Sequence, residues 1–297
     1  MKNILIIGGD SFIATKFFDT HKSEFNISVI SRIDSGKCGE LIIEDLFSVD
    51  STCFSGIDTV INFAAIVHRP DIKEKSIYDR INYELPLSLA NKAKAEGVKH
   101  FIQLSTIAVY GNVDFINSSS LENPVNFYGE SKLKADHGLA KMQDSNFIVS
   151  SIRPPMVYGG GLAPGNMLKL IKASLKGIPL PFGGVNNKRD FINVANLVEA
   201  LNSVVLHSIA GIILPTDKQS ISTEEIVKLV GANTNNKVRV IAIPKFCLQI
   251  ASKLFSTIYN KVFGSLLVEC NLSDQYYKPK FKIENGIKDM VDAIQKQ

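Results

Sequence analysis

The stretch Met1-Lys2-Asn3-Ile4-Leu5-Ile6-Ile7-Gly8-Gly9-Asp10-Ser11-Phe12-Ile13-Ala14 opens the chain and joins a short, continuous apolar run to paired glycines and a plausible helix. An apolar run of this length, closed by glycines, is typical of a buried strand in a parallel sheet. Glycines at the turn let the backbone approach a phosphate, and the N-terminus of the next helix favours its negative charge. The stretch therefore predicts a parallel α/β sheet with a phosphate-binding turn after its first strand.

The turn matches the dinucleotide-binding pattern G-x-x-G-x-x-G only in part. With Gly8 as the first glycine, Ser11 and Ala14 stand at the second and third glycine positions. Both residues are small, so a close approach of the backbone to a pyrophosphate is preserved. We expect Gly8, Ser11, Phe12 and Ile13 to contact the cofactor.

A second apolar run, 27–30, ends at Ser31 and Arg32. NAD-binding chains usually place an acid here to hold the ribose 2′-hydroxyl, whereas an arginine suits a 2′-phosphate. Arg32 could also be a solvated loop cation. The sequence thus favours NADP(H) over NAD(H), with Ser31 and Arg32 at the ribose. Further cofactor contacts are expected from Asp45 and Leu46, and from Ala64 and Ala65 at the end of the strand 58–61.

Tyr128 and Lys132 stand four residues apart in the run Asn126-Phe127-Tyr128-Gly129-Glu130-Ser131-Lys132. On a helix this spacing places both side chains on one face. A lysine charge ~4 Å from a phenol, at an effective dielectric constant of ~20, is worth up to roughly 4 kcal/mol, or about three pKa units. We therefore expect Lys132 to bring the pKa of Tyr128 towards neutrality, where the phenol can exchange protons. Taken alone, the pair is also compatible with an ordinary exposed contact.

Three further motifs occur in order around this pair. They are Ser105-Thr106-Ile107-Ala108-Val109-Tyr110-Gly111, Arg153-Pro154-Pro155-Met156-Val157-Tyr158-Gly159 and Lys188-Arg189-Asp190-Phe191-Ile192-Asn193-Val194. With them, nearly the whole chain resembles the extended short-chain dehydrogenase/reductase family of the NAD-dependent epimerase/dehydratase type, and within it the nucleotide-sugar 4-ketoreductases and UDP-hexose 4-epimerases. The resemblance implies a catalytic triad of Thr106, Tyr128 and Lys132, with Tyr128 and Lys132 also touching the cofactor.

The same resemblance implies roles for residues outside the triad. Pro155 would pass beside the nicotinamide, and Arg189 would grip the substrate diphosphate unless it forms a surface salt bridge. Asn82 would lie near the cofactor or serve as a structural amide. His68 would reach the substrate or remain a solvated loop histidine, and Asn166 is also assigned to the substrate.

The residues after Thr106 exclude one reaction of the family. Members that dehydrate a sugar carry Asp-Glu there, because elimination needs an acid and a base. This chain has Ile107-Ala108, and neither side chain can move a proton. The remaining chemistry is hydride transfer at a sugar carbon, most simply C4.

Two features favour reduction of a UDP-4-keto-6-deoxy-N-acetylhexosamine. Ser31-Arg32 suits the reducing NADPH pool, and the segments 177–183 and 263–266 resemble 4-keto-reductases. A UDP-hexose or UDP-N-acetylhexosamine 4-epimerase is the alternative, because such enzymes share much of this sequence. A catalytically silent dinucleotide-binding regulator is a third possibility, supported by the degraded glycine pattern.

A length of 297 residues suits two linked units around a large core. The fold class expected is α/β: a Rossmann-type doubly wound parallel sheet with a smaller, discontinuous C-terminal substrate domain. Residues 1–156 form the dinucleotide-binding domain, to which about 190–207 return, and 157–297 mainly bind substrate.

The net charge and the cysteine spacing indicate which partners and which cell compartment to expect. The net charge is +4, and acidic and basic residues are interspersed along the chain. This suits binding of an anionic UDP-sugar and does not indicate a basic stripe that would bind nucleic acid. The cysteines have no metal-ligand spacing, which predicts no metal and reduced thiols in the cytoplasm: Cys38, Cys53, Cys247 and Cys270.

One apolar segment raises the question of a membrane. The segment 243–255 is broken by lysines and too short to span a bilayer. It is expected to be a core helix or, alternatively, an amphipathic helix resting on the membrane surface. Helices at 78–96 and 128–142 are expected, by analogy alone, to pair in a homodimer.

Overall fold

The computed structural model describes residues 1–37, 39–67, 71–234, 238–242 and 263–297. These residues form two compact units. Unit 1 comprises Met1–Gly111, Leu121–Arg153 and Val198–Ile213, and unit 2 comprises Asn112–Ser120, Pro154–Leu197 and Leu214–Gln297. Each unit is therefore assembled from separate pieces of the chain.

Unit 1 is built on a seven-stranded sheet with the order β11-β7-β5-β4-β1-β2-β3. All neighbouring strands run parallel. The strands are β1 (Asn3–Ile7), β2 (Asn26–Ser31), β3 (Glu40–Ile42), β4 (Thr59–Asn62), β5 (His100–Leu104), β7 (Ile148–Ile152) and β11 (Gly211–Ile213). The order reverses direction at β1 and β4, which makes the sheet doubly wound and confirms the predicted fold class.

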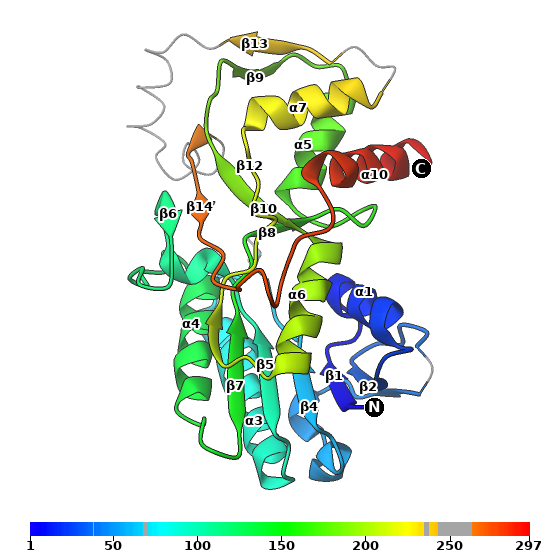
Figure 1. Ribbon diagram of the computed structural model, residues 1–297, viewed down its shortest axis with the longest axis vertical. Helices are drawn as coiled ribbons and strands as arrows, with labels where there is room; N and C mark the ends of the chain where they lie inside the picture. The colour runs from blue at the N-terminus through cyan, green and yellow to red at the C-terminus, as the bar shows by residue number, and fades with distance from the viewer. Residues whose placement is uncertain (38, 68–70, 235–237, 243–262) are drawn as a thin grey trace. The chain divides into compact units, whose positions relative to one another are not determined.

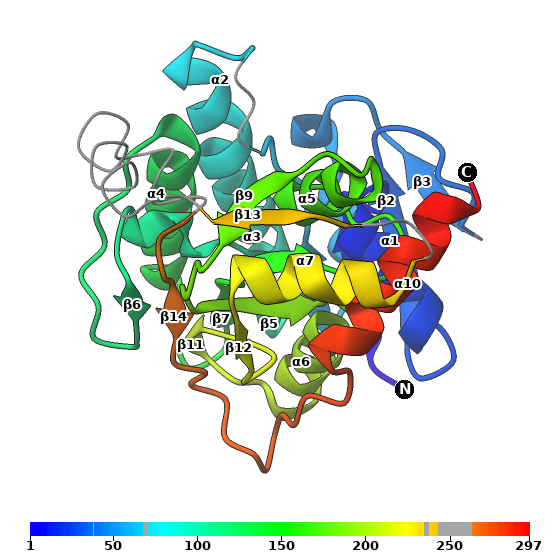
Figure 2. The ribbon, with the colours of Figure 1, turned by 90° about the horizontal axis from the view of Figure 1, so that it is seen from above.

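Helices cover both faces of this sheet. They are α1 (Phe12–His21), α2 (Lys75–Asp79), α3 (Leu85–Ala95), α4 (Phe127–Ala140) and the part of α6 (Val194–His207) that belongs to unit 1. Helices α3 and α4 lie on one face, and α1 and α6 on the other (Figures 1 and 2). Short helical turns complete the unit: η1 (Leu46–Ser48), η2 (Ser51–Phe54), the π-helical η3 (Arg80–Glu84) and η4 (Ile107–Tyr110).

In the described residues, unit 2 contains three small sheets and three complete helices. The sheets are β12-β10-β8, β13-β9 and β14-β6. Their strands are β6 (Phe115–Ile116), β8 (Met156–Tyr158), β9 (Leu180–Gly183), β10 (Arg189–Asn193), β12 (Ser220–Ile221), β13 (Val240–Ala242) and β14 (Leu267–Val268). The helices are α5 (Asn166–Leu175), α7 (Thr223–Ala232) and α10 (Ile283–Gln295). Helix α7 begins with a capping box between Ser222 and Glu225.

The return of the chain to unit 1 differs from the expected 190–207. Strand β10 pairs with β8 and β12 inside unit 2. Its residues 191–193 lie opposite residues 156–158 of β8 in a parallel pair. The chain joins unit 1 at Val198 and stays until Ile213, where β11 adds an edge strand to β7. The expected substrate-binding role of unit 2 stays a prediction.

Asp217 holds the strand ends of unit 2 together. Its buried carboxylate accepts hydrogen bonds from the Tyr158 hydroxyl (2.7 Å), from the Asn196 amide (2.7 Å) and from the backbone N–H of Asn193 (3.0 Å). Burial raises the pKa of Asp217 to about 6, although these hydrogen bonds oppose the rise. One carboxylate thereby joins β8, β10 and the start of α6.

Two further expectations concern association with a membrane and formation of a homodimer. Among the described residues, no helix has the length and apolar character needed to cross a bilayer. The segment 243–255, predicted as a core or amphipathic helix, lies outside the described residues. The homodimer through the helices at 78–96 and 128–142 stays a prediction.

A buried histidine makes the stability of unit 1 depend on pH. His100 Nε2 lies 2.6 Å from the Ser150 hydroxyl, which donates to the carbonyl of Ile209 at 2.6 Å. Burial, assisted by the charge of Lys2, lowers the pKa of His100 from 6.5 to about 4. Between these two values the unfolded chain binds a proton that the folded chain rejects, so stability falls as the pH is lowered.

We expect the free energy of unfolding to lose up to about 3 kcal/mol through His100 between pH 6.5 and pH 4. The variant His100→Gln removes the titration and should make urea-unfolding stability less dependent on pH over this range. The exposed His207→Gln is the matched control and should keep the wild-type slope. An equal slope in all three proteins would exclude this role for His100.

Candidate functional site

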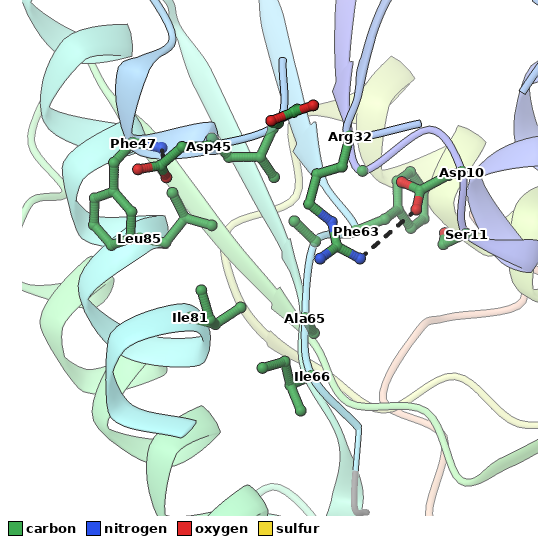
Figure 3. A pocket seen from close by; sticks show the side chains of 14 residues that line it. Asp10, Ser11, Arg32, Asp45, Phe47, Phe63, Ala65, Ile66, Ile81 and Leu85 are labelled. Carbon is green, nitrogen blue, oxygen red and sulfur yellow. Dashed lines mark hydrogen bonds and ion pairs between the residues drawn. The ribbon is translucent and has the colours of Figure 1, made fainter. Parts of the chain in front are cut away.

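A pocket opens at the carboxyl ends of β1 and β4, where the strand order reverses. It holds about 610 Å³ of space that is continuous with solvent. Its lining comes from the segments that follow β1, β2, β3 and β4, and from η3 and the start of α3: Gly8, Asp10, Ser11, Arg32, Glu44, Asp45, Leu46, Phe47, Phe63, Ala64, Ala65, Ile66, Ile81 and Leu85 (Figure 3).

Gly8 is required where the first strand turns into the pocket. Its φ is +78°, and a Cβ there would lie 2.6 Å from the backbone nitrogen of Ala64. The Ala64 segment is itself fixed, because its N–H donates to Asn62 Oδ1 at 3.1 Å while the Asn62 amide donates to Gln103 at 2.8 Å. The turn after β1 and the end of β4 therefore approach each other as only a glycine permits.

The N-terminus of α1 gives the pocket its site for an anion. Ser11 caps the helix by accepting a hydrogen bond from the N–H of Ala14 at 3.1 Å, and it also lines the pocket. The N-terminal N–H groups of a ten-residue helix attract a phosphate. The glycine turn and the capped helix fit the pyrophosphate of a dinucleotide.

The far end of the pocket suits a flat, apolar ring. Phe47, Ile81 and Leu85 gather there beside Asp45 (Figure 3). The guanidinium of Arg80 lies 5.0 Å from the centroid of the Phe47 ring and 3.8 Å from the Asp45 carboxylate. The expected contacts Asp45 and Leu46 lie in this lining, as do the expected Gly8, Ser11, Arg32, Ala64 and Ala65.

Ser31 does not line the pocket as the expected ribose contact would. Its hydroxyl is buried and donates to Glu40, which also accepts hydrogen bonds from the N–H and hydroxyl of Ser35 at 2.9 and 2.5 Å. Burial alone would raise the pKa of Glu40, but these hydrogen bonds outweigh it and lower the pKa to about 2. The expected Phe12 and Ile13 lie in the first turn of α1, also outside the lining.

Asn82 serves as a structural amide. It is fully buried in the π-helical η3. Its amide donates to the carbonyl of Ile66 (2.9 Å) and to the Ser131 hydroxyl (3.1 Å), and its oxygen accepts from the N–H of Ile66 (2.8 Å). Each polar group of the side chain has a protein partner, so Asn82 links the pocket wall to α4, and its contact with the cofactor stays a prediction.

Helix α4 carries Tyr128 and Lys132 past the turn η4, which begins after Thr106. Thr106 lies beside the Tyr128 hydroxyl, close enough to influence the pKa of the phenol. The close approach depends on Gly129, because a Cβ there would lie 2.6 Å from the carbonyl oxygen of Ala108. Lys132 is buried, and its ammonium donates to the carbonyl of Leu104 at 2.5 Å. The structure thus brings together the three residues of the expected triad.

The pKa of Tyr128 is raised, not lowered as the i,i+4 spacing predicted. Burial raises it to about 12, the hydrogen bond with Thr106 opposes the rise, and the charge of Asp136 adds to it. The charge of Lys132 is not among the causes of this shift, and its ammonium donates to the carbonyl of Leu104. Burial lowers the pKa of Lys132 to about 8, against the effect of Asp136. Desolvation therefore outweighs the attraction between phenol and ammonium.

A buried ion pair between Arg153 and Asp136 joins helix α4 to the end of β7. Arg153, at the end of β7, donates from Nε to Asp136 on α4 at 2.8 Å and from a terminal nitrogen to the Tyr110 hydroxyl at 2.8 Å. It also pairs with Glu122 at 2.6 Å. The Ser105 hydroxyl donates to the same Asp136 oxygen at 2.7 Å. Four segments of unit 1 thus meet at one guanidinium that is fully buried.

Three expected site residues belong to unit 2, and one lies outside the described residues. Pro155 precedes β8, and Asn166 is the first residue of α5. Arg189 opens β10 and donates to the carbonyl of Gly264 at 2.8 Å. Burial lowers its pKa, although Asp114 opposes the shift. His68 is the residue that the described ranges do not include.

Sequence reasoning missed half of the pocket lining. Phe63 and Ile66 flank the predicted Ala64 and Ala65, and their position at a strand end could have indicated them. Asp10 stands in the glycine turn itself, but it is not one of the three glycine positions of the dinucleotide-binding pattern. The remaining residues come from segments whose approach depends on tertiary packing, and no sequence signal indicates them: Glu44, Phe47, Ile81 and Leu85.

The pocket, the glycine turn and the Thr106–Tyr128–Lys132 cluster all lie in unit 1 and are features expected of a dinucleotide-binding α/β protein. The family model described as "NAD dependent epimerase/dehydratase family" matches residues 4–212. The chain belongs to this family, which confirms the resemblance found in the sequence.

Several of the similar proteins are sugar epimerases. The chain is 30% identical to a UDP-glucose 4-epimerase of Vibrio cholerae, over 99% of this chain and 95% of the relative. It is 27% identical to an N-acetyl-alpha-D-glucosaminyl-diphospho-ditrans,octacis-undecaprenol 4-epimerase of Escherichia coli O157:H7, over 86% of this chain and 82% of the relative. The fold matches that of a UDP-glucuronic acid 4-epimerase from Bacillus cereus in complex with NAD, with a TM-score of 0.80, 20% identity and 99% of each chain covered.

We expect Arg153→Met to lower the free energy of unfolding by about 3–5 kcal/mol, because it leaves Asp136 buried without its partner. The matched control is Lys94→Met, which breaks the exposed pair Lys94–Asp144 (2.6 Å) and should cost less than about 1 kcal/mol. Chemical unfolding of both variants measures the difference. Equal losses would contradict the structural role assigned to Arg153.

Proposed function

We propose that the protein is a 4-epimerase of a nucleotide sugar that works with a bound nicotinamide dinucleotide. The observation that carries the proposal is the position of Thr106 beside the Tyr128 hydroxyl, with Lys132 one turn further along α4. Asn82 joins this helix to Ile66 in the wall of the dinucleotide pocket, so one rigid unit holds both. The activity of the V. cholerae relative, similar over 99% of this chain, supports the same reaction.

Tyr128 is the group that moves a proton at the sugar hydroxyl. As the phenolate it takes the proton of the sugar hydroxyl when the C–H bond at C4 is broken, and as the phenol it returns the proton when that bond is remade on the other face. Thr106 lies beside the Tyr128 hydroxyl and is available to the same sugar oxygen, and Lys132 would bind the ribose of the nicotinamide. Groups held in place before the reaction stabilise charge without reorganising.

A bound nicotinamide dinucleotide would supply hydride transfer at the sugar carbon. Gly8, Ser11 and the N-terminus of α1 would hold its pyrophosphate, and the pocket end formed by Phe47 and Leu85 would take its adenine. Arg189 is proposed to bind the substrate diphosphate through paired charge-assisted hydrogen bonds. A diphosphate is common to the UDP-sugar and polyprenyl-linked substrates named for the relatives.

Reduction of a UDP-4-keto-6-deoxy-N-acetylhexosamine, the reaction first expected from the sequence, remains the second candidate. The observation in its favour is the protonated state of Tyr128, whose pKa of about 12 suits proton donation to a ketone. Epimerisation contains this same half-reaction, so the protonated phenol favours reduction over epimerisation only weakly. A silent regulator would have no chemical use for the three groups together.

Incubation of the purified protein with UDP-glucose and with UDP-N-acetylglucosamine, without added reductant, tests the proposal. We expect the C4 epimer to form, as followed by proton NMR. A parallel reaction contains UDP-4-keto-6-deoxy-N-acetylhexosamine and NADPH, with absorbance read at the reduced nicotinamide band. Turnover confined to this second reaction would establish a reductase and contradict the proposal.

Replacing Tyr128 by Phe should lower turnover by at least about 10²-fold, because the proton donor and acceptor is lost. Dinucleotide binding, measured by calorimetry, should stay nearly unchanged, because the binding pocket is intact. Tyr83→Phe on η3 is the control and should retain wild-type turnover. Activity of the Tyr128 variant within a few-fold of wild type would remove the mechanism.

A further inference from the structure

Carboxylates outnumber cations in the pocket lining, so the lining is unfavourable for a dinucleotide that carries an extra phosphate. Among the described lining residues, three are carboxylates and one is a guanidinium: Asp10, Glu44, Asp45 and Arg32. Asp45 is offset by Arg80, which lies 3.8 Å away and outside the lining. Arg32 is therefore the cation on which recognition of a 2′-phosphate by this lining would depend.

Arg32 is directed at Asp10. Its guanidinium lies 3.9 Å from the Asp10 carboxylate, and the two side chains face each other across the pocket (Figure 3). The Arg32 side chain is 61% exposed and that of Asp10 only 18%. Asp10 is thus held by the glycine turn between Gly9 and the helix cap Ser11, while Arg32 reaches towards it from the end of β2.

The other cation near this turn is already engaged. The ammonium of Lys37 donates to the carbonyl of Gly9 (2.9 Å), to the Thr15 hydroxyl (3.1 Å) and to the Ser35 hydroxyl (2.6 Å). Moving it towards a ligand would break hydrogen bonds that shape the turn. Lys37 therefore does not replace Arg32.

We propose that Asp10 selects NAD(H) over NADP(H) by engaging Arg32 and withholding its guanidinium from a 2′-phosphate. A 2′-phosphate would bring close to two negative charges beside Asp10 and would have to compete with it for Arg32. A ribose 2′-hydroxyl carries no charge and can donate to a carboxylate. This reverses the preference that Arg32 alone indicated in the sequence, and it rests on the proposed function.

The test compares four proteins by isothermal titration calorimetry: wild type, Asp10→Asn, Arg32→Ala and the double variant. The ligands are NAD+ and NADP+, with AMP and adenosine 2′,5′-bisphosphate as probes of the adenosine end alone. The control is Asp19→Asn on α1, which breaks an exposed pair with Lys22 at the same 3.9 Å and changes the net charge equally, outside the pocket. Nucleotide released by acid from each purified protein is identified by mass spectrometry.

We expect wild type to bind NAD+ at least about tenfold more tightly than NADP+. Asp10→Asn should tighten NADP+ and adenosine 2′,5′-bisphosphate by about tenfold, with NAD+ and AMP changing less than about threefold. In the Arg32→Ala background the gain should shrink, because no guanidinium is released. Asp19→Asn should behave as wild type.

Three outcomes overturn the inference: a wild type that prefers NADP+, an unchanged ratio in Asp10→Asn, or an equal gain with and without Arg32. Each would leave the proposed epimerase standing, provided that one dinucleotide binds and the epimer forms. Failure of both dinucleotides to bind would instead remove the proposed function.

Discussion

The placement of the candidate proton-transfer residues depends on the buried pair between Arg153 and Asp136. Asp136 lies one turn beyond Lys132 on α4, and Arg153 directly follows the last residue of β7. Two charges removed from water contribute to stability only when each keeps its partners, so their contact fixes helix and strand relative to each other. Tyr110 and Glu122 bind the same guanidinium. The helix is thereby held at the edge of the sheet where the pocket opens.

Burial decides the electrostatics around Tyr128 more than the neighbouring charge does. The desolvated phenol and the desolvated ammonium of Lys132 shift in opposite directions, each towards its neutral form. Asp136 favours the protonated form of both groups. The site therefore keeps protons on both groups at neutral pH, and it is the reacting sugar and the bound dinucleotide that must favour release from the phenol.

The sequence indicates the frame of the site, and tertiary packing supplies its details. The apolar run before Gly8 and the ordered motifs around Thr106 and Tyr128 are local patterns, so they predicted the parallel sheet, the family and the cluster. Edge strands such as β3 and β11 have three residues and carry no periodic signal. The engagement of Ser31 by Glu40, and of Arg32 by Asp10, joins residues from different segments that only the folded backbone brings together.

The interleaved path of the chain has a consequence for its synthesis. Unit 1 is completed only by Val198–Ile213, after the chain has passed through much of unit 2. Until β11 leaves the ribosome, β7 is the outermost strand and presents unpaired N–H and C=O groups to solvent. A nascent chain that lacks β11 carries an open sheet edge at β7, so unit 1 completes its sheet only after Val198–Ile213 have been synthesised.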